Sequence, residues 1–299
     1  MRRRSMLCGA GALGLAGLSR GVQAADGNID KAARVLARDG TRLFHREQGQ
    51  GRTIVYLHGW GLSSAAWDYQ RAPLMERGFR CIAFDRRGHG RSDDPGRGYD
   101  FDSLAGDLDS VLTQLDARGV TLVAHSFGGG EAVRYLSKYG LERVSRLLLL
   151  APCTPCLFNA DGNPAGLPQA AFDALRAVIA QDYPKWLDNN EEPFFVPETS
   201  RGMRNWVKAL MVQASLPALL QCHRAMTQTD FRAEMRKLAL PTLVIQGDVD
   251  RSLPLELTGR PSAALIPGAQ LKVYAGAPHG LPFTHADMLN NDIAAFALA

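Results

Sequence analysis

Ser126 is the residue whose surroundings in this sequence most clearly indicate chemistry. It lies in Ala124-His125-Ser126-Phe127-Gly128-Gly129-Gly130, between a short apolar run and a stretch with helical spacing. A serine at such an abrupt strand-to-helix turn exposes its hydroxyl, and the amides that follow can bind an oxyanion. Ala124 replaces the first glycine of the usual G-x-S-x-G motif, so an ordinary helix N-cap is the competing interpretation. His125 is expected to point away from Ser126, because side chains alternate along a strand.

A nucleophilic serine needs a base, and the base needs a carboxylate to orient it. Asp248 and Asp250 follow the apolar run 240–247, and His279 lies in a Gly-Ala-Pro-His-Gly loop after the next apolar run. Both loops follow the carboxyl ends of predicted strands, where open parallel sheets bind their ligands. The order Ser, Asp, His therefore predicts acyl-transfer chemistry, and the spacing alone leaves the choice between the two aspartates open.

Predicted strands and helices alternate along the first half of the chain. The fold they form must position the loops that contain Ser126, the two aspartates and His279. The predicted strands are 53–57, 79–84, 121–124 and 144–150, and the predicted helices lie near 64–76, 102–118 and 128–139. Two shorter strands flank a tight turn at Asp39-Gly40. Such alternation predicts an α/β fold in which helices cover both faces of a parallel sheet.

The alternation stops after Ala151. Residues 152–237 lack continuous apolar strands and contain predicted helices at 172–179, 205–211 and 217–226. We expect this segment to form a helical lid between the sixth strand and the seventh, which starts at Thr242. Residues 25–151 and 238–299 are then expected to form the core, which ends in a helix near 285–297.

Several motifs occur together in one order. They are His58-Gly59-Trp60, Phe84-Asp85-Arg86-Arg87-Gly88-His89-Gly90-Arg91-Ser92, Ser126-Phe127-Gly128-Gly129-Gly130-Glu131, Thr229-Asp230-Phe231, the run from Pro241 to Asp248, and His279-Gly280-Leu281. In these motifs the chain resembles an α/β-hydrolase of the cofactor-free haloperoxidase, perhydrolase and arylesterase group, from about residue 38 to its end. The resemblance implies an α/β-hydrolase fold with a mostly parallel eight-stranded sheet, helices on both faces and an inserted helical lid.

The resemblance also implies roles for individual residues. In this group the acid precedes a short turn that ends in Val/Leu-Pro, which selects Asp250 as the acid; Asp248 is expected to bind loop amides. The oxyanion is expected to be held by the backbone amides of Trp60 and Phe127, the second of which directly follows the nucleophile. His58 is expected to brace the oxyanion loop by hydrogen bonds.

Substrate choice is expected to lie in the lid, which roofs Ser126. Members of the group place aromatic side chains from the corresponding region in the pocket, which singles out Trp206, and Phe158 is a second predicted substrate-binding residue. The further apolar candidates are Phe194, Phe195, Met211 and Met226.

No metal site or organic cofactor is expected. His45, His223 and His285 have no partners at metal-ligand spacing, so they are interpreted as solvated or core residues. There is no H-E-x-x-H, Walker or dinucleotide motif. Cys153 and Cys156 fit a local disulfide as well as two free thiols.

The first residues have the pattern of a targeting segment. Arg2-Arg3-Arg4 precede a short Gly/Ala-rich apolar stretch and an A-x-A-like site at 22–24. We expect residues 1–24 to be a twin-arginine signal that exports the protein to the periplasm or beyond, with a membrane-anchoring helix as the alternative. This segment holds four of the 34 basic residues and no acid, so the remaining chain is balanced in charge and carries no nucleic-acid footprint.

The predicted function is that of a serine hydrolase acting on small carboxylic esters or lactones, with perhydrolysis as a side reaction. Gly61 follows Trp60 where perhydrolase-type relatives often carry proline, which favours hydrolysis as the main reaction. A non-catalytic hydrolase-like ligand-binding protein is the alternative. The expected partner is a small ester, without nucleic acid or stable membrane association after processing, and the sequence leaves the oligomeric state open.

Overall fold

The computed structural model of this chain describes residues 34–299. The expected signal at 1–24 and its alternative lie outside these residues. An eight-stranded sheet has the order β1-β2-β4-β3-β5-β6-β7-β8. Its strands are β1 (Arg34–Leu36), β2 (Arg42–Gln48), β3 (Arg52–Leu57), β4 (Phe79–Phe84), β5 (Val120–His125), β6 (Val144–Leu150), β7 (Thr242–Gly247) and β8 (Gln270–Tyr274). Only the pairs β1–β2 and β2–β4 are antiparallel, so the predicted mostly parallel eight-stranded sheet is confirmed.

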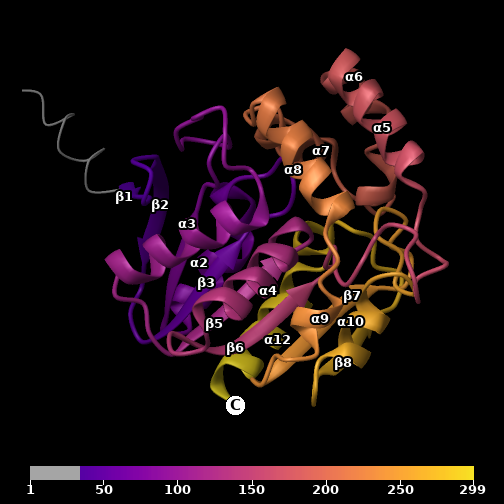
Figure 1. Cartoon of the computed structure of the whole chain (residues 1–299). Coiled ribbons are helices and arrows are strands. Elements are labelled where there is room, and N and C mark those ends of the chain that lie inside the picture. Colours follow the sequence, from indigo (N-terminus) through magenta and orange to yellow (C-terminus); the bar gives the residue numbers. More distant parts are fainter. Residues whose placement is uncertain (1–33) are drawn as a thin grey trace, which may run out of the picture. The chain divides into compact units, whose positions relative to one another are not determined.

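Two hydrophobic clusters cover the two faces of the sheet, because side chains alternate along each strand. In β6, Leu147 and Leu149 belong to one cluster, and Leu148 and Leu150 belong to the other. The first cluster includes residues of α3 (Phe101–Gln114) and α4 (Phe127–Tyr139), which Figure 1 shows in front of the sheet. The second includes residues of α2 (Asp68–Glu76) and α12 (Ala286–Leu298).

The segment between β6 and β7 is helical. It contains α5 (Gln169–Gln181), α6 (Tyr183–Asn189), η2 (Glu192–Phe194), α7 (Arg201–Met211), α8 (Leu216–Gln228) and α9 (Arg232–Met235). The three helices predicted there lie within α5, α7 and α8. The remaining elements are η1 (Ser64–Trp67), α10 (Gly259–Leu265) and α11 (Leu281–Thr284). No helix in the part of the chain that the structure describes is long and apolar enough to cross a bilayer.

Two differences from the predicted helices have local causes. Helix α6 was not predicted, because Pro184 resembles a helix breaker, yet this proline occupies the first turn, where its missing N–H is not needed. The Asp182 side chain caps the same helix by accepting a hydrogen bond of 3.0 Å from the Lys185 amide. Helix α3 ends at Gln114 rather than near 118, because the backbone turns back at Asp116, whose φ is 40°.

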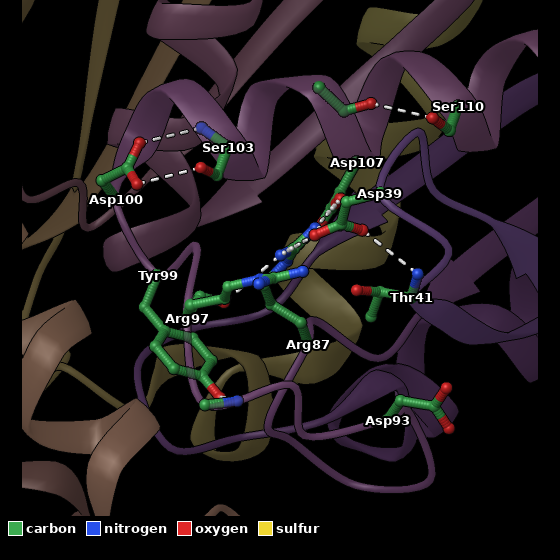
Figure 2. Close-up of polar contacts among 12 residues, drawn as sticks. Asp39, Thr41, Arg87, Asp93, Arg97, Tyr99, Asp100, Ser103, Asp107 and Ser110 are labelled. Atoms are coloured by element: carbon green, nitrogen blue, oxygen red, sulfur yellow. Dashed lines mark hydrogen bonds and ion pairs between the residues drawn. The ribbon is translucent and has the colours of Figure 1, made fainter.

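A buried arginine holds the N-terminal hairpin to the rest of the fold. Arg87 lies in the loop after β4 and donates to both carboxylate oxygens of Asp107 on α3, at 2.6 and 2.7 Å. It also donates to Asp39 in the hairpin turn, at 2.8 Å, and Figure 2 shows the contacts of this guanidinium with both carboxylates. Because the arginine is only 3% exposed, removing either partner would leave a charge without full compensation.

Candidate active site

Ser126 lies at an abrupt turn between β5 and α4. Its backbone has φ 54° and ψ −116°, a combination that costs a non-glycine residue free energy and that nucleophile turns adopt. Two backbone hydrogen bonds stabilise this strained conformation. The Ser126 amide donates to the Leu150 carbonyl at 2.9 Å, and the Ser126 carbonyl accepts from the Cys153 amide at 3.1 Å.

Two positions of the motif around Ser126, Gly128 and Ala124, differ in how much room they leave for a side chain. At Gly128 an added Cβ would lie 2.8 Å from the Leu57 carbonyl oxygen, so only glycine lets α4 approach β3 so closely. Ala124, which replaces the first motif glycine, is fully buried in β5 between Leu57 and Leu149 of the neighbouring strands. The departure from G-x-S-x-G is therefore accommodated within the sheet.

A continuous chain of hydrogen bonds joins Ser126, His279 and Asp250. The Ser126 Oγ lies 2.9 Å from His279 Nε2, and His279 Nδ1 lies 2.8 Å from Asp250 Oδ2. All three side chains are at least nine-tenths buried. Because a carboxylate only accepts hydrogen bonds, His279 must carry its proton on Nδ1, which leaves the Nε2 lone pair facing the serine hydroxyl.

The two candidate aspartates occupy different places. Asp250 Oδ1 accepts from the amides of Ser252 and Leu253, at 3.0 and 2.8 Å, which leaves Oδ2 aimed at His279. Asp248 instead accepts from the Gly276 amide at 2.7 Å and so ties the loop after β7 to the loop after β8. The structure thus brings Asp250, and not Asp248, to the histidine.

The two amides proposed for the oxyanion belong to Trp60, after β3, and Phe127, the first residue of α4. Neither amide donates to an acceptor within residues 34–299. The loop at Trp60 comes close to the nucleophile, since a Cβ on Gly59 would lie 3.4 Å from Ser126 Cβ. The partial positive charge at the start of α4 adds to the attraction for an oxyanion.

A buried ionic cluster supports this loop. Arg86 pairs with Glu131 on α4 at 2.7 Å and donates to the His58 carbonyl at 2.9 Å. The Arg86 amide donates to His58 Nε2 at 3.1 Å, and His58 Nδ1 lies 2.8 Å from the Gly59 carbonyl oxygen and 3.2 Å from Arg86 Nη1. His58 therefore lies where the sequence predicted a brace for the oxyanion loop.

His125 lies closer to the site than expected. Its Nε2 is 3.2 Å from the His279 carbonyl oxygen, and the two rings are 5.1 Å apart. Burial, together with His279, lowers the pKa of His125 to about 3, so the neutral ring donates to that carbonyl. Side-chain alternation places His125 on the same face of the sheet as Val123, as expected. The segment that contains His279 also packs on that face. The strand pattern alone could not predict this packing.

A cavity of about 360 Å³ adjoins Ser126 and His279. Its walls are mainly apolar and come largely from α5 to α8. Four of the apolar candidates from the sequence line it, namely Phe194, Phe195, Met211 and Met226.

Trp206 and Phe158, the two predicted substrate-binding residues, do not line this cavity. Trp206 lies between the rings of Tyr69 and Phe283, at 5.7 and 6.0 Å, because its side of α7 packs against η1 and the C-terminal region. Its neighbour Val207 reaches the cavity instead. Phe158 packs against the main core cluster and does not belong to the cavity wall.

Sequence reasoning also missed His223 as a pocket residue. It was interpreted as solvated or core, yet this buried residue of α8 lines the cavity. The sequence contained no partner signal for it, because Arg176, which lies 3.2 Å from its Nδ1, is on a different helix.

The cysteines in the described range are buried free thiols. Cys153 Sγ lies 3.8 Å from the Phe127 carbonyl oxygen, and Cys156 Sγ lies 3.5 Å from that of Phe158. Burial raises the pKa of Cys153 to about 12, so this thiol stays protonated at neutral pH. Among residues 34–299 no cluster of three or more His, Cys, Asp or Glu side chains could hold a metal ion.

Gly61 has φ 73°, a value that proline cannot adopt because its ring fixes φ near −65°. The Tyr183 hydroxyl and the Met211 Cε also lie 3.0 and 3.2 Å from where a Cβ would stand. The backbone after Trp60 therefore takes a course that a proline-containing loop could not follow.

Buried histidines make the stability of the fold depend on pH. Burial, and then the neighbouring Arg86, lowers the pKa of His89 to about 3, whereas an unfolded histidine titrates near ~6.5. Between these values the unfolded chain binds more protons, so the free energy of unfolding falls as the pH drops. We expect His89→Gln to reduce this slope between pH 6 and 4 by up to about 1.4 kcal/mol per pH unit.

Urea denaturation of wild type and His89→Gln at several pH values checks this expectation. His89 contacts none of Ser126, Asp250 and His279, so the comparison concerns stability alone. Parallel pH dependences for the two proteins would show that His89 is already protonated in the native state.

The comparisons with known proteins agree with this architecture. The model of the alpha/beta hydrolase family matches residues 54–291. The chain is 39% identical over 266 residues to a non-heme chloroperoxidase of Kitasatospora aureofaciens, covering 87% of this chain and 97% of that protein. It is 34% identical over 271 residues to a bifunctional esterase/perhydrolase of Acinetobacter calcoaceticus, covering 88% of this chain and 98% of that protein.

Solved structures show the same similarity. An esterase from Exiguobacterium antarcticum superposes with a TM-score of 0.87 at 32% identity, covering 89% of this chain and 99% of that one. A bromoperoxidase from Bacillus anthracis gives a TM-score of 0.85 at 33% identity, covering 89% of this chain and 100% of that one.

Proposed function

Because this chain belongs to the α/β-hydrolase family, we propose that it is a serine hydrolase that cleaves small carboxylic esters or lactones. The main support for this proposal is the hydrogen-bonded arrangement of Ser126, His279 and Asp250. It adjoins a cavity large enough for a small ester. The similarity to esterases and to non-heme haloperoxidases supports the same conclusion.

In the first half of the reaction, Ser126 Oγ attacks the ester carbonyl carbon while His279 Nε2 takes the hydroxyl proton. The carbonyl oxygen becomes an oxyanion, which the amides of Trp60 and Phe127 stabilise. As the tetrahedral intermediate collapses, His279 returns the proton to the leaving alkoxide, and the alcohol departs. Asp250 keeps the imidazole in the required tautomer and stabilises its positive charge.

In the second half, water attacks the acyl-enzyme and gives up a proton to His279. The intermediate then releases the carboxylic acid, and the proton returns to Ser126 Oγ. Hydrogen peroxide can replace water in this step and yields a peracid, so perhydrolysis is a side reaction of the same acyl-enzyme. The non-catalytic alternative lacks support, since every relative named above carries an enzyme name.

A fluorophosphonate probe tests the proposal directly. The activated Ser126 is expected to form a covalent phosphonyl adduct, which peptide mass spectrometry locates on that residue. A protein that binds small esters but resists the probe would instead be a hydrolase-like ligand-binding protein.

We also propose that the protein is exported by a twin-arginine signal at residues 1–24, as the Arg2-Arg3-Arg4 start and the A-x-A site suggest. Replacing the three arginines with lysine is expected to leave the unprocessed precursor in the cytoplasm, as detected by cell fractionation. Unchanged export of the lysine variant would argue against the twin-arginine route.

A further inference from the structure

His223 is a buried polar residue in a mainly apolar wall of the cavity. It is 5% exposed and lines the cavity from α8. The aromatic rings of Trp60 and Phe172 meet its ring edge-on, with centroids 6.0 and 6.2 Å away. The Trp60 indole is itself fixed, since its Nε1 donates to the Leu219 carbonyl at 2.8 Å. His223 thus adjoins the residue whose amide is proposed to bind the oxyanion.

The Arg176 guanidinium determines which nitrogen of His223 carries the proton. Its Nη1 lies 3.2 Å from His223 Nδ1 and 2.9 Å from Thr227 Oγ1. A guanidinium only donates hydrogen bonds, so Nδ1 must be the acceptor. Burial, and then the positive charge of Arg176, lowers the pKa of His223 to about 4. The neutral ring therefore carries its proton on Nε2.

Both partners of this arrangement are themselves held in place. Arg176 is also paired with Asp173 on the same helix. The Thr227 hydroxyl donates its own proton to the His223 carbonyl at 2.9 Å, which leaves its oxygen free to accept from Arg176. The imidazole orientation is therefore built into α5 and α8 before any ligand binds.

The Nε2–H group has no acceptor among the residues that the structure describes. Nε2 is not fully covered by protein atoms. Because His223 lines the cavity, this nitrogen is open to the cavity. A buried N–H that loses its hydration without gaining an acceptor is unfavourable. A ligand that brings an acceptor oxygen to this position would therefore be favoured over one that brings only hydrocarbon.

We propose that His223 Nε2–H binds an acceptor oxygen of the substrate that is separate from the scissile ester group. This proposal rests on the proposed hydrolase function and narrows its substrates to esters that carry a second oxygen, such as a keto group, within reach of the wall formed by Trp60 and α8. Arg176 acts as a positioning residue, because it holds the tautomer of His223 without facing the reacting atoms.

Two matched pairs of esters test the proposal and show which side of the ester bears the second oxygen. The acyl pair is 4-nitrophenyl 4-oxopentanoate against 4-nitrophenyl 4-methylpentanoate. The alcohol pair is 2-oxopropyl butyrate against isobutyl butyrate. Within each pair a keto oxygen replaces a methyl group of similar size, so the ratio of kcat/KM values isolates the effect of the oxygen.

His223→Leu is expected to lower the keto-to-alkyl ratio about tenfold for at least one pair, the size expected of one hydrogen bond. His223→Gln, whose amide N–H can stand near the Nε2 position, is expected to restore much of that ratio. His285→Leu is the matched control, because His285 does not line the cavity, and it is expected to leave the ratio unchanged. Equal ratios in wild type and His223→Leu for both pairs would overturn the proposal.

A second readout separates this proposal from the proposed function. In a Ser126→Ala protein, ¹⁵N NMR is expected to show the His223 proton on Nε2 and a shift of that signal on titration with 4-oxopentanamide. If no ester is hydrolysed but this shift occurs, the hydrolase proposal fails while the His223 site stands. A signal that shows the proton on Nδ1 would refute the His223 site itself. So would the absence of a shift with both 4-oxopentanamide and N-(2-oxopropyl)butanamide, the corresponding probe for a keto group on the alcohol side.

Discussion

Ser126→Ala is expected to lower ester hydrolysis by a factor on the order of 10⁴ to 10⁶ while the protein stays folded. Ser126 Oγ is the atom proposed to form the acyl-enzyme, and it lies 2.9 Å from His279 Nε2, the base that activates it. Initial rates on 4-nitrophenyl butyrate measure the loss, and circular dichroism checks the fold.

Two further variants make this result specific. His279→Ala is expected to cost about as much as Ser126→Ala, and the double variant little more, because members of a triad act as a unit. Ser145→Ala serves as the matched control, since its hydroxyl bonds only to the Gly119 and Val120 carbonyls. Retention of more than a tenth of the activity in Ser126→Ala would mean that another group is the nucleophile.

Asp250→Asn is expected to lower the rate about 10⁴-fold, the loss seen when a triad aspartate becomes an amide. The asparagine can present its N–H groups to His279 Nδ1, which favours the wrong tautomer and turns the protonated nitrogen toward Ser126. Its carbonyl can still accept from the Ser252 and Leu253 amides, so the loop is expected to persist. The pH dependence of kcat/KM and the melting temperature separate loss of catalysis from loss of structure.

Asp248→Asn is the matched comparison for this position. Asp248 binds the Gly276 amide, and an asparagine carbonyl can accept the same hydrogen bond, so near-wild-type rates are expected. The opposite outcome, a severe loss in Asp248→Asn with Asp250→Asn nearly unaffected, would reverse the assignment of the acid.

Most strands and helices, and the residues Ser126 and His279, could be predicted from local patterns in the sequence, whereas Asp250 was chosen over Asp248 through the family resemblance. The strand at 144–150 was predicted with the bounds of β6, since a run of four consecutive leucines, all fully buried in the structure, leaves little ambiguity. The turn at Ser126 was predicted from neighbouring residues alone, and the glycine at 128 is dictated by the close approach of Leu57. Loops that follow parallel strands also had to meet at one edge of the sheet.

The tertiary structure was needed to establish which side chains of the helices between β6 and β7 face the cavity. Helical spacing shows that α7 has an apolar face, but it does not say whether that face meets the cavity or the core. Trp206 packs on Tyr69 and Phe283 while Val207 and Met211 reach the cavity. Likewise, His223 gains its role from Arg176, 47 residues away in the chain. Such contacts depend on how helices from distant segments rotate and pack against each other, and no local pattern records that rotation.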